Sequence, residues 1–318
     1  MNDYPLVYVL ILNFNQPQLT IGCVESIMAS DYPNFKIIVV DNGSDYNNYI
    51  SLERIIDNNK ISIYRLDKNI GYVGGMNYAL KEASTKNPDY YLVLNNDAVI
   101  EKTAITHLVN CAQRSSNNCI VSGKVYHYDR PDVIQYIGSE LIDAEYLTFK
   151  HIGVNEIDNG QFEKEEKRDL IDDIYWLLPG TVYSKIGGYN ELFYFNGESA
   201  DYCLRAKNEG FLLLYCPLAK LWHKGGASIG GRNNNSFLEY YQIKSTLLLR
   251  FLYLKRINFT VFYCKIFFKA LKKMIKGIFK VWLKDNANWE YSLAEMKGWM
   301  SFSNDMLFGR LKRKQDAL

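Results

Sequence analysis

Three short polar residues, Asn95, Asn96 and Asp97, directly follow the apolar run LVL in the segment DYYLVLNNDAVI (residues 89–100). The apolar run and the tyrosines beside it favour a buried β-strand. Amide and carboxylate oxygens at the carboxyl end of such a strand lie where an open α/β sheet binds its ligands. These oxygens suit Mg²⁺ or Mn²⁺, which often bridges the phosphates of a nucleotide. The alternative is a polar turn after a core strand.

Two earlier apolar segments also run into polar clusters. Leu6–Leu12 is followed by NFN (residues 13–15), and Ile37–Val40 is followed by DNGS (residues 41–44). An acid at such a strand end, here Asp41, can accept hydrogen bonds from a ribose or a base edge. In a mostly parallel sheet these strand ends lie on one side, so we expect the clusters to converge.

A third expected strand, Ile61–Leu66, precedes a glycine-rich segment that reads NIGYVGGMN (residues 69–77). Its glycines would let the backbone approach a flat ligand closely, and Asn77 would pair with the edge of that ligand. The spacing is neither the GxGxxG fingerprint nor a P-loop, and a plain loop is the alternative. We expect a helix only from about Asn77 to Ala83.

Two acids and a histidine in the second half lie at the ends of expected elements. Glu198 and Asp201 begin a helical pattern that should end at Gly210. Because the helix dipole favours carboxylates at this end, N-capping acids are the alternative to a catalytic role. His223 follows the expected strand Leu212–Tyr215, where a core or turn histidine is commoner than a ligand.

Strands and helices alternate over the first hundred residues at the spacing of βαβ units, which predicts a mostly parallel, doubly wound sheet. The pattern from Ser122 to Arg168 predicts hairpins and an exposed charged stretch at 156–168. Asp172–Tyr183 then predicts a further strand with Pro-Gly punctuation. A length of 318 residues predicts about two domains.

The cysteines and the apolar runs indicate the cellular compartment in which we expect the protein to act. Six cysteines form no CxxC pair, which argues for a reducing environment and against a zinc site or a disulfide framework. The N-terminal segment carries an acid before its apolar run and no basic region, so we expect a first strand and not a signal peptide. No uninterrupted apolar run approaches the ~20 residues that a membrane-spanning helix needs.

Positive charge is concentrated near the C-terminus. The net charge is +2, yet residues 240–284 contain eleven Lys or Arg and no acid, so the rest of the chain carries a net −9. At ~100° per residue, seven lysines fall on one arc of about 120°, with apolar residues opposite them. These are Lys265, Lys269, Lys272, Lys273, Lys276, Lys280 and Lys284. The pattern predicts a basic amphipathic helix on an anionic membrane surface. The alternatives are a helix packed on the catalytic domain with solvated lysines and, least favoured, a nucleic-acid contact.

Taken in order, six segments closely resemble the inverting family 2 glycosyltransferases of the GT-A fold, and most of all their bacterial rhamnosyltransferase-like branch. The segments are ILNFNQPQLTIGCVESI, IIVVDNGSD, NIGYVGGMNYAL, LVLNNDAVI, GESADYCLRAKNEGF and LWHKGGAS, and the resemblance covers about residues 5–255. It implies an α/β, Rossmann-like, mostly parallel sheet flanked by helices. We expect a GT-A domain at 1–240, with nucleotide-sugar binding at about 1–120 and the acceptor half at about 121–240. A basic helical arm would follow at 241–318.

The resemblance also implies roles for individual residues. Asp97 matches the last acid of the family's DxD motif and His223 its late metal-binding histidine, so both would hold Mg²⁺ or Mn²⁺. Asp41 would contact the nucleoside. The remaining residues expected to bind the nucleotide-sugar are Asn13, Asn15, Asn69, Gly71, Gly75, Asn77, Asn95 and Asn96. The base would come from the family's Glu-Asp-x-Asp motif.

That motif here reads Glu198-Ser199-Ala200-Asp201, so a serine stands where the family keeps its base. A serine hydroxyl is a poor proton acceptor near neutral pH. We therefore expect Glu198 to act as the base, with Asp201 as its competitor. Asn95 likewise replaces the first acid of the DxD motif.

The expected function is metal-dependent, inverting transfer from a UDP- or dTDP-sugar, including dTDP-rhamnose, to a glycan or lipid-linked acceptor. The setting would be bacterial surface polysaccharide synthesis, in the cytoplasm at the inner face of the membrane, without nucleic acid. The alternative is a catalytically lapsed homologue that binds nucleotide-sugar or glycan within an assembly complex.

Overall fold

A computed structural model describes residues 4–53, 59–225, 236–282 and 289–311. The chain divides into two compact units. The first comprises Met1–Glu140, Lys150–Tyr194 and Glu198–Ser228, and the second Leu141–Phe149, Phe195–Gly197 and Ile229–Leu318.

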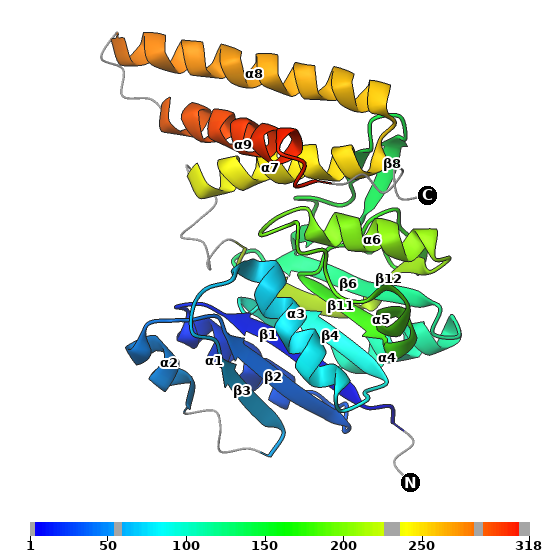
Figure 1. Ribbon diagram of the computed structural model, residues 1–318. Coiled ribbons are helices and arrows are strands. Elements are labelled where there is room, and N and C mark those ends of the chain that lie inside the picture. Colours follow the sequence, from blue (N-terminus) through cyan, green and yellow to red (C-terminus); the bar gives the residue numbers. More distant parts are fainter. Residues whose placement is uncertain (1–3, 54–58, 226–235, 283–288, 312–318) are drawn as a thin grey trace. The chain divides into compact units, whose positions relative to one another are not determined.

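The first unit is built on a mixed sheet of ten strands among its described residues (Figure 1). Four strands pair in parallel, as the sequence predicted, and their order is β4-β1-β2-β3. They are β1 (Val7–Asn13), β2 (Phe35–Asp41), β3 (Ile61–Arg65) and β4 (Tyr90–Leu94). Asn13 and Asp41 are the last residues of neighbouring strands and lie opposite each other in register. The carboxyl ends of these strands therefore bring two of the predicted polar clusters together.

The other half of the sheet adds antiparallel and long strands. Its order continues from β4 as β11-β6-β12-β10, with β5 paired to β12 and β7 to β6. These strands are β5 (Ala98–Ile100), β6 (Cys119–His127), β7 (Ile134–Tyr136), β10 (Glu166–Lys167), β11 (Tyr175–Pro179) and β12 (Leu212–His223). A separate pair is formed by β8 (Ser139–Asp143) and β9 (Thr148–His151). The charged stretch 156–168 is largely exposed, as expected, although it contributes β10 and buries Arg168.

Helices cover both faces of the sheet. Side chains of α1 (Pro17–Met28) and α4 (Ala104–Arg114) share one core cluster with alternate residues of β1, including Val9 and Ile11. In Figure 1, α3 (Gly71–Ser84), α5 (Gly180–Ile186) and α6 (Glu198–Asn208) lie on the opposite face. A short helix, α2 (Tyr46–Leu52), follows β2. This is the layered arrangement that the βαβ spacing predicted.

The prediction that α3 begins only near Asn77 was wrong, because the glycine-rich segment forms its first turns. A Cβ at Gly75 would lie 2.4 Å from Leu12 Cδ1, so this glycine allows the helix to pack closely on β1. Gly71 begins the helix with φ +81°, a backbone conformation that glycine adopts at little cost. These glycines therefore serve the packing of a helix on the sheet.

Two expected strand boundaries also needed correction. The segment expected as one strand, Asp172–Tyr183, gives β11 only to Pro179, and α5 begins at Gly180. The strand expected at Leu212–Tyr215 runs on to His223, because a register shift between Cys216 and Lys220 lets it pass Pro217. Gly123 of the neighbouring strand β6 leaves room for this irregular backbone. A Cβ at Gly123 would lie only 2.0 Å from the Ala219 carbonyl oxygen.

The second unit contains three helices among its described residues, namely α7 (Ser236–Tyr253), α8 (Arg256–Trp282) and α9 (Trp289–Leu307). Helix α9 packs on both of the others. Phe302 lies 5.9 Å from Phe251 of α7 and 6.0 Å from Phe259 of α8, measured between ring centroids. Among the described helices, none is long and apolar enough to cross a membrane.

Candidate active site

The two expected metal ligands, Asp97 and His223, lie side by side although 126 residues separate them in the sequence. Strands β5 and β12 pair antiparallel with His223 opposite Ala98, which places the histidine beside the preceding Asp97. Asp97 Oδ1 is 2.9 Å from His223 Nε2, and both side chains are buried. A third predicted residue, Asn95, brings its amide nitrogen within 3.4 Å of the same ring nitrogen.

The chemistry of this pair fits a divalent cation. His223 Nδ1 lies 2.6 Å from Gln135 Oε1, which can only accept a hydrogen bond, so Nδ1 carries the proton. In the neutral ring, Nε2 then presents a lone pair to the Asp97 carboxylate. The Nε2 lone pair and the carboxylate oxygen repel each other unless a proton or a cation lies between them. A histidine oriented by a hydrogen bond from its other nitrogen is the usual arrangement of a metal ligand.

Gln135, on β7, was not predicted from the sequence. Gln135 lies 88 positions before His223 in the sequence, and it is one of several amide side chains in an irregular part of the chain. No motif marks it, and only the pairing of β6 with both β7 and β12 brings it beside the histidine.

A chain of hydrogen bonds joins this cluster to the expected nucleoside contact. Asn96 Nδ2 donates to Thr20 Oγ1 at 3.1 Å, and Thr20 donates to Asn13 Oδ1 at 2.7 Å. Asn13 Nδ2 then donates to Asp41 Oδ2 at 2.7 Å. All four side chains are buried. Three predicted residues and one that the sequence reasoning missed, Thr20 of α1, therefore form one network along the carboxyl edge of the sheet.

The first polar loop is fixed by the same network. The backbone N–H of Ser44 donates to Asp41 Oδ1 at 3.0 Å, and Ser44 Oγ accepts from the backbone of Asn15 at 2.8 Å. Arg65 Nε lies 4.0 Å from Asp41 Oδ1. Asp41 is fully buried, and its carboxylate holds Asn13 and the Ser44 loop in place at the strand ends.

Two asparagines of the glycine-rich segment, Asn69 and Asn77, have different roles: one lies at the loop edge and the other holds two segments together. Exposed Asn69 accepts hydrogen bonds from Asn42 Nδ2 at 3.1 Å and from the Gly71 backbone at 2.8 Å. Asn77 is bonded at both ends of its amide to the backbone of Tyr189, at 3.0 and 2.7 Å. The structure thus brings Asn69 to the loop edge, whereas Asn77 ties α3 to the segment after α5.

Glu198 and Asp201 both lie in the first turn of α6, as expected, but in different surroundings. Asp201 accepts from Arg205 Nε at 2.8 Å, and the same guanidinium also donates to the carbonyls of Ile186 and Gly188. These bonds favour a structural role for Asp201. Burial raises the pKa of the Glu198 carboxyl well above its usual range, and the nearby Asp173 carboxylate raises it further.

Asp173 is a buried carboxyl that the sequence reasoning did not single out. Burial and the neighbouring Asp172 charge raise its pKa to about 7. A sequence signal did exist, because the pair DD stands directly beside the apolar run IYWLLP of a core strand. It went unnoticed because this acid precedes its strand, whereas the predicted clusters all follow theirs.

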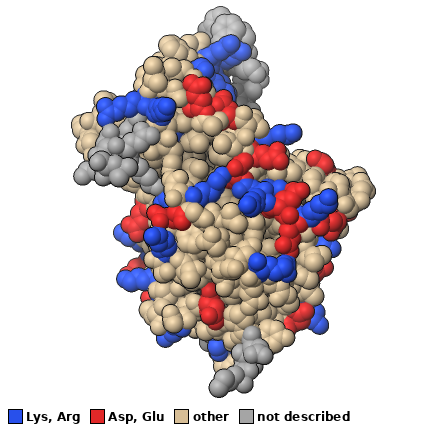
Figure 2. Space-filling view, turned by 90° about the vertical axis from the view of Figure 1, so that its right-hand side faces the viewer, with Lys and Arg blue, Asp and Glu red and all other residues tan. Residues whose placement is uncertain are grey.

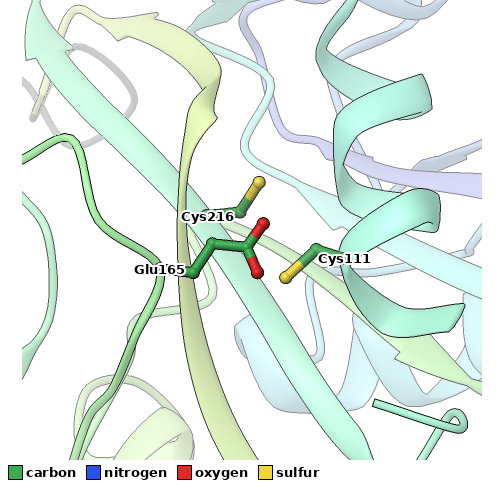
Figure 3. A group of neighbouring side chains, drawn as sticks. All are labelled: Cys111, Glu165 and Cys216. Carbon is green, nitrogen blue, oxygen red and sulfur yellow. The ribbon is translucent and has the colours of Figure 1, made fainter. Parts of the chain in front are cut away.

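A second group of metal-type ligands lies between α4 and β12 (Figure 3). One ligand atom each of Cys111, Glu165 and Cys216 lies within 4.8 Å of the others. The Cys216 sulfur and burial raise the pKa of the Cys111 thiol, so this sulfur is a protonated donor. Exposed Glu165 is paired with Arg114. We therefore assign this group to a thiol contact and a surface ion pair.

Comparison with known proteins identifies relatives in sequence and solved structures of similar fold. A 197-residue segment is 22% identical to glycosyltransferase GlyG of Streptococcus pneumoniae and covers 62% of each chain. The mannosyltransferase PcManGT of Pyrobaculum calidifontis, solved with GDP-Man and Mn²⁺, superposes with a TM-score of 0.53 at 11% identity, covering 77% of this chain and 63% of that one. GalNAc-T7, solved with UDP, GalNAc and Mn²⁺, gives 0.56 at 12% identity, covering 78% and 51%.

These likenesses confirm the expected GT-A-like fold, and the chain spans less than two thirds of the length of each of these proteins. The sequence profile of Glycosyl transferase family 2 matches residues 8–167, about half of the chain. The matched part contains the Asn13–Asp41 network and Asp97. The chain therefore belongs to glycosyl transferase family 2.

Proposed function

We propose that this chain transfers a sugar from a nucleotide-sugar to an acceptor hydroxyl, with a divalent cation held by Asp97 and His223. The observation that carries the proposal is the 2.9 Å approach of the Asp97 carboxylate to a histidine nitrogen whose partner nitrogen is bonded to Gln135. The two structural neighbours, each solved with Mn²⁺ and a nucleotide, support the choice of ion. Mg²⁺ and Mn²⁺ both suit the carboxylate, and the imidazole favours Mn²⁺.

The reaction would be a single displacement with inversion at the anomeric carbon. When bound, the ion neutralises negative charge on the departing diphosphate. The network from Asp41 through Asn13 and Thr20 to Asn96 orients the donor, because its members are locked by mutual hydrogen bonds. The proton of the acceptor hydroxyl passes to a buried carboxyl, for which the sequence offers Glu198 at the start of α6 and the structure adds Asp173 before β11.

The donor and acceptor follow from the resemblance to the rhamnosyltransferase-like branch. We propose a UDP- or dTDP-sugar, including dTDP-rhamnose, and a glycan or lipid-linked acceptor in bacterial surface polysaccharide synthesis. The rival function is a lapsed homologue that binds nucleotide-sugar without transferring it. Ser199 in the position of the usual base is the observation that favours the rival.

Helix α8 supports a place of action at an anionic membrane surface. At ~100° per residue its described residues fall into three sectors. Phe259, Tyr263, Phe267 and Ala270 form the sector that packs inward, where Phe267 lies 4.7 Å from Trp299 of α9. A second sector is apolar and exposed, with Ile257 73%, Phe268 64% and Ile275 57% accessible, together with Val261.

The third sector of α8 is basic and adjoins the exposed apolar one. It contains Lys265, Lys269, Lys272, Lys273 and Lys276, all exposed, while the side chain of Lys280 and all of Lys284 lie outside the described residues. Lys273 is paired with Glu295 of α9, and Lys265 lies 5.0 Å from the Tyr146 ring. Exposed apolar side chains beside a row of lysines are typical of helices that lie in a membrane interface.

The metal site can be tested by calorimetric titration of UDP and dTDP with and without Mn²⁺. We expect tight binding only with Mn²⁺ and a loss of that dependence in Asp97→Ala. Asp31→Ala, which removes an exposed carboxylate between α1 and β2, is the matched control and should bind like the wild type. Wild-type affinity in EDTA as high as with Mn²⁺, or an unchanged Mn²⁺ dependence in Asp97→Ala, would contradict the proposal.

A further inference from the structure

Four buried polar groups meet where α3, β11 and α6 come together in the first unit. They are the Tyr72 and Tyr189 hydroxyls, Asp173 Oδ2 and Glu198 Oε2. The charges of Asp173 and Glu198 both act on Tyr72, and the Tyr72 and Tyr189 rings lie 6.0 Å apart. None of the four atoms has a well-formed hydrogen bond to the described residues. Buried polar groups are nearly always bonded, so such a cluster indicates groups that a substrate completes.

This cluster reaches the same edge of the sheet as the proposed metal site. Strand β11 pairs antiparallel with β4, with Tyr175 opposite Leu94. The pairing continues one residue further, because the Asn95 N–H donates to the Ile174 carbonyl at 3.0 Å. Asp173, the next residue, therefore lies alongside the Asn95–Asp97 segment. A carboxyl at this position lies just beyond the paired ends of β4 and β11, at the sheet edge where the metal site is proposed.

The hydrogen-bond donors around the two carboxyls are unequal. The Tyr72 and Tyr189 hydroxyls both counteract the rise in the pKa of the Asp173 carboxyl, although neither makes a well-formed hydrogen bond to it. The donor acting on Glu198 is its own backbone N–H. Two neighbouring carboxyls in a buried site do not both ionise readily. The single negative charge is favoured where hydroxyl donors stabilise it, and that position is Asp173.

We propose that Asp173 is the catalytic residue that accepts the proton of the acceptor hydroxyl, with Glu198 as its protonated neighbour. The proposal rests on the transferase function proposed above and supplies the base that Ser199 cannot provide. In the step, the acceptor proton moves to the Asp173 carboxylate as the acceptor oxygen bonds to the anomeric carbon. The bond from that carbon to the diphosphate oxygen breaks, and its electron pair leaves with the diphosphate.

The acid–base properties of the pair agree with this division of roles. Asp173 titrates near neutrality, where a general base works best, while burial and the Asp173 charge keep the pKa of Glu198 well above its usual value. The titratable groups that face Asp173 are Asp172 in its own segment, Tyr72 of α3, Tyr189 after α5, and Glu198 and Cys203 of α6.

The test uses the full chain and water as the acceptor. Release of nucleoside diphosphate would be measured with Mn²⁺ and UDP-glucose, UDP-galactose, GDP-mannose or dTDP-rhamnose, whichever most raises the melting temperature. We expect Asp173→Asn to lower the rate by roughly 10²–10⁴-fold. The Kd for nucleoside diphosphate with Mn²⁺ should change less than two-fold. Glu198→Gln should lose at least ten-fold less activity than Asp173→Asn.

The pH profile separates a base from a structural role. For the wild type, kcat/KM should rise with pH and level off near 7. Tyr72→Phe removes one donor from Asp173 and should move that midpoint upward without abolishing the reaction. This variant keeps the proposal testable if Asp173→Asn folds poorly.

Three results would overturn the proposal. They are a folded Asp173→Asn with normal turnover, a greater loss in Glu198→Gln, or a wild type that binds nucleotide with Mn²⁺ yet releases no diphosphate. Donor binding persists in all three results. The two variant results would therefore overturn only the assignment of the base, and the wild-type result would show that the chain binds the donor without catalysing transfer. Loss of Mn²⁺-dependent nucleotide binding in the wild type would instead overturn the underlying function.

Discussion

At the scale of single residues, Asp173 should lower the stability of the fold at neutral and alkaline pH. Its pKa is raised from 3.8 to about 7, so the folded state holds the proton more tightly than the unfolded state. The contribution of this group to stability is therefore highest below about pH 4 and declines as the pH rises towards 7. Asp173→Asn cannot ionise, so we expect its melting temperature to exceed that of the wild type more at pH 8 than at pH 5.

The size of this effect follows from the length of the chain. Each 1 kcal/mol by which ionisation of Asp173 destabilises the fold should appear as about 1.5–2 °C in a chain of 318 residues. Thermal denaturation followed by circular dichroism at both pH values would measure it. A pH-independent difference between variant and wild type would show that the side chain acts by packing and not by charge.

The sequence singled out Asp97 and Asp41 as candidate ligands but could not reveal the partners of these residues. Asp97 follows an apolar strand, where a polar turn is the alternative, and the convergence of several such strand ends favours a ligand site. Gln135 and Thr20 carry no comparable signal, because a lone amide or hydroxyl is common everywhere in a sequence. Their roles depend on strand pairings that bring residues 70 to 90 positions apart into contact.

At the scale of elements, the packing of α3 on β1 predicts opposite outcomes for two glycine substitutions. In Gly75→Ala the new methyl would lie 2.4 Å from Leu12 Cδ1, so the helix or the leucine must move. Overpacking of this kind costs about 1–3 kcal/mol. A methyl added at Gly22, inside α1, would have no atom within 4 Å, so Gly22→Ala should stabilise by roughly 0.5–1 kcal/mol.

Urea denaturation of the two variants beside the wild type would check this pair. Both changes add the same single methyl to a helix, so any difference reports the space at each position and not helix propensity. A Gly75→Ala protein as stable as Gly22→Ala would mean that the glycine-rich segment is not needed for close packing.

The same elements show where the hydrophobic pattern was sufficient. Strands β1, β2 and β4 are buried on both faces and were found to within a residue or two. The start of α3 was missed because glycines favour loops by propensity, and only the contact with Leu12 explains a helix there. For α8, periodicity predicted two faces, but packing on α9 divides the apolar one into a buried and an exposed sector.

At the scale of the whole molecule, the two compact units contain different sets of charged and polar residues. The first holds the network from Asp41 to Asn96 and the Asp97–His223 pair within one sheet. The second contains α8 and most of the basic stretch 240–284. On the face shown in Figure 2, acidic and basic side chains lie interspersed. Residues 240–284 instead carry a surplus of eleven basic residues without an acid. A lipid-linked acceptor would give that surplus a purpose.

We expect the full chain to co-sediment with vesicles of phosphatidylcholine and phosphatidylglycerol, and less with phosphatidylcholine alone. Each lysine near an anionic surface contributes about 1 kcal/mol, so Lys269→Gln with Lys276→Gln should weaken partitioning about 30-fold. Phe268→Asp with Ile275→Asp should weaken it as well, since both side chains are exposed on the apolar sector. Ile157→Asp changes an equally exposed apolar residue of the first unit and should have no effect.

Salt provides the independent criterion for this surface. Attraction between lysines and anionic lipid must weaken as the Debye length shortens, so binding should fall between about 50 and 500 mM salt. Mn²⁺-dependent nucleotide binding by the α8 variants should stay normal, because the substitutions lie outside the catalytic unit. If sedimentation is insensitive to salt and to both double substitutions, α8 is a structural helix whose lysines are merely solvated.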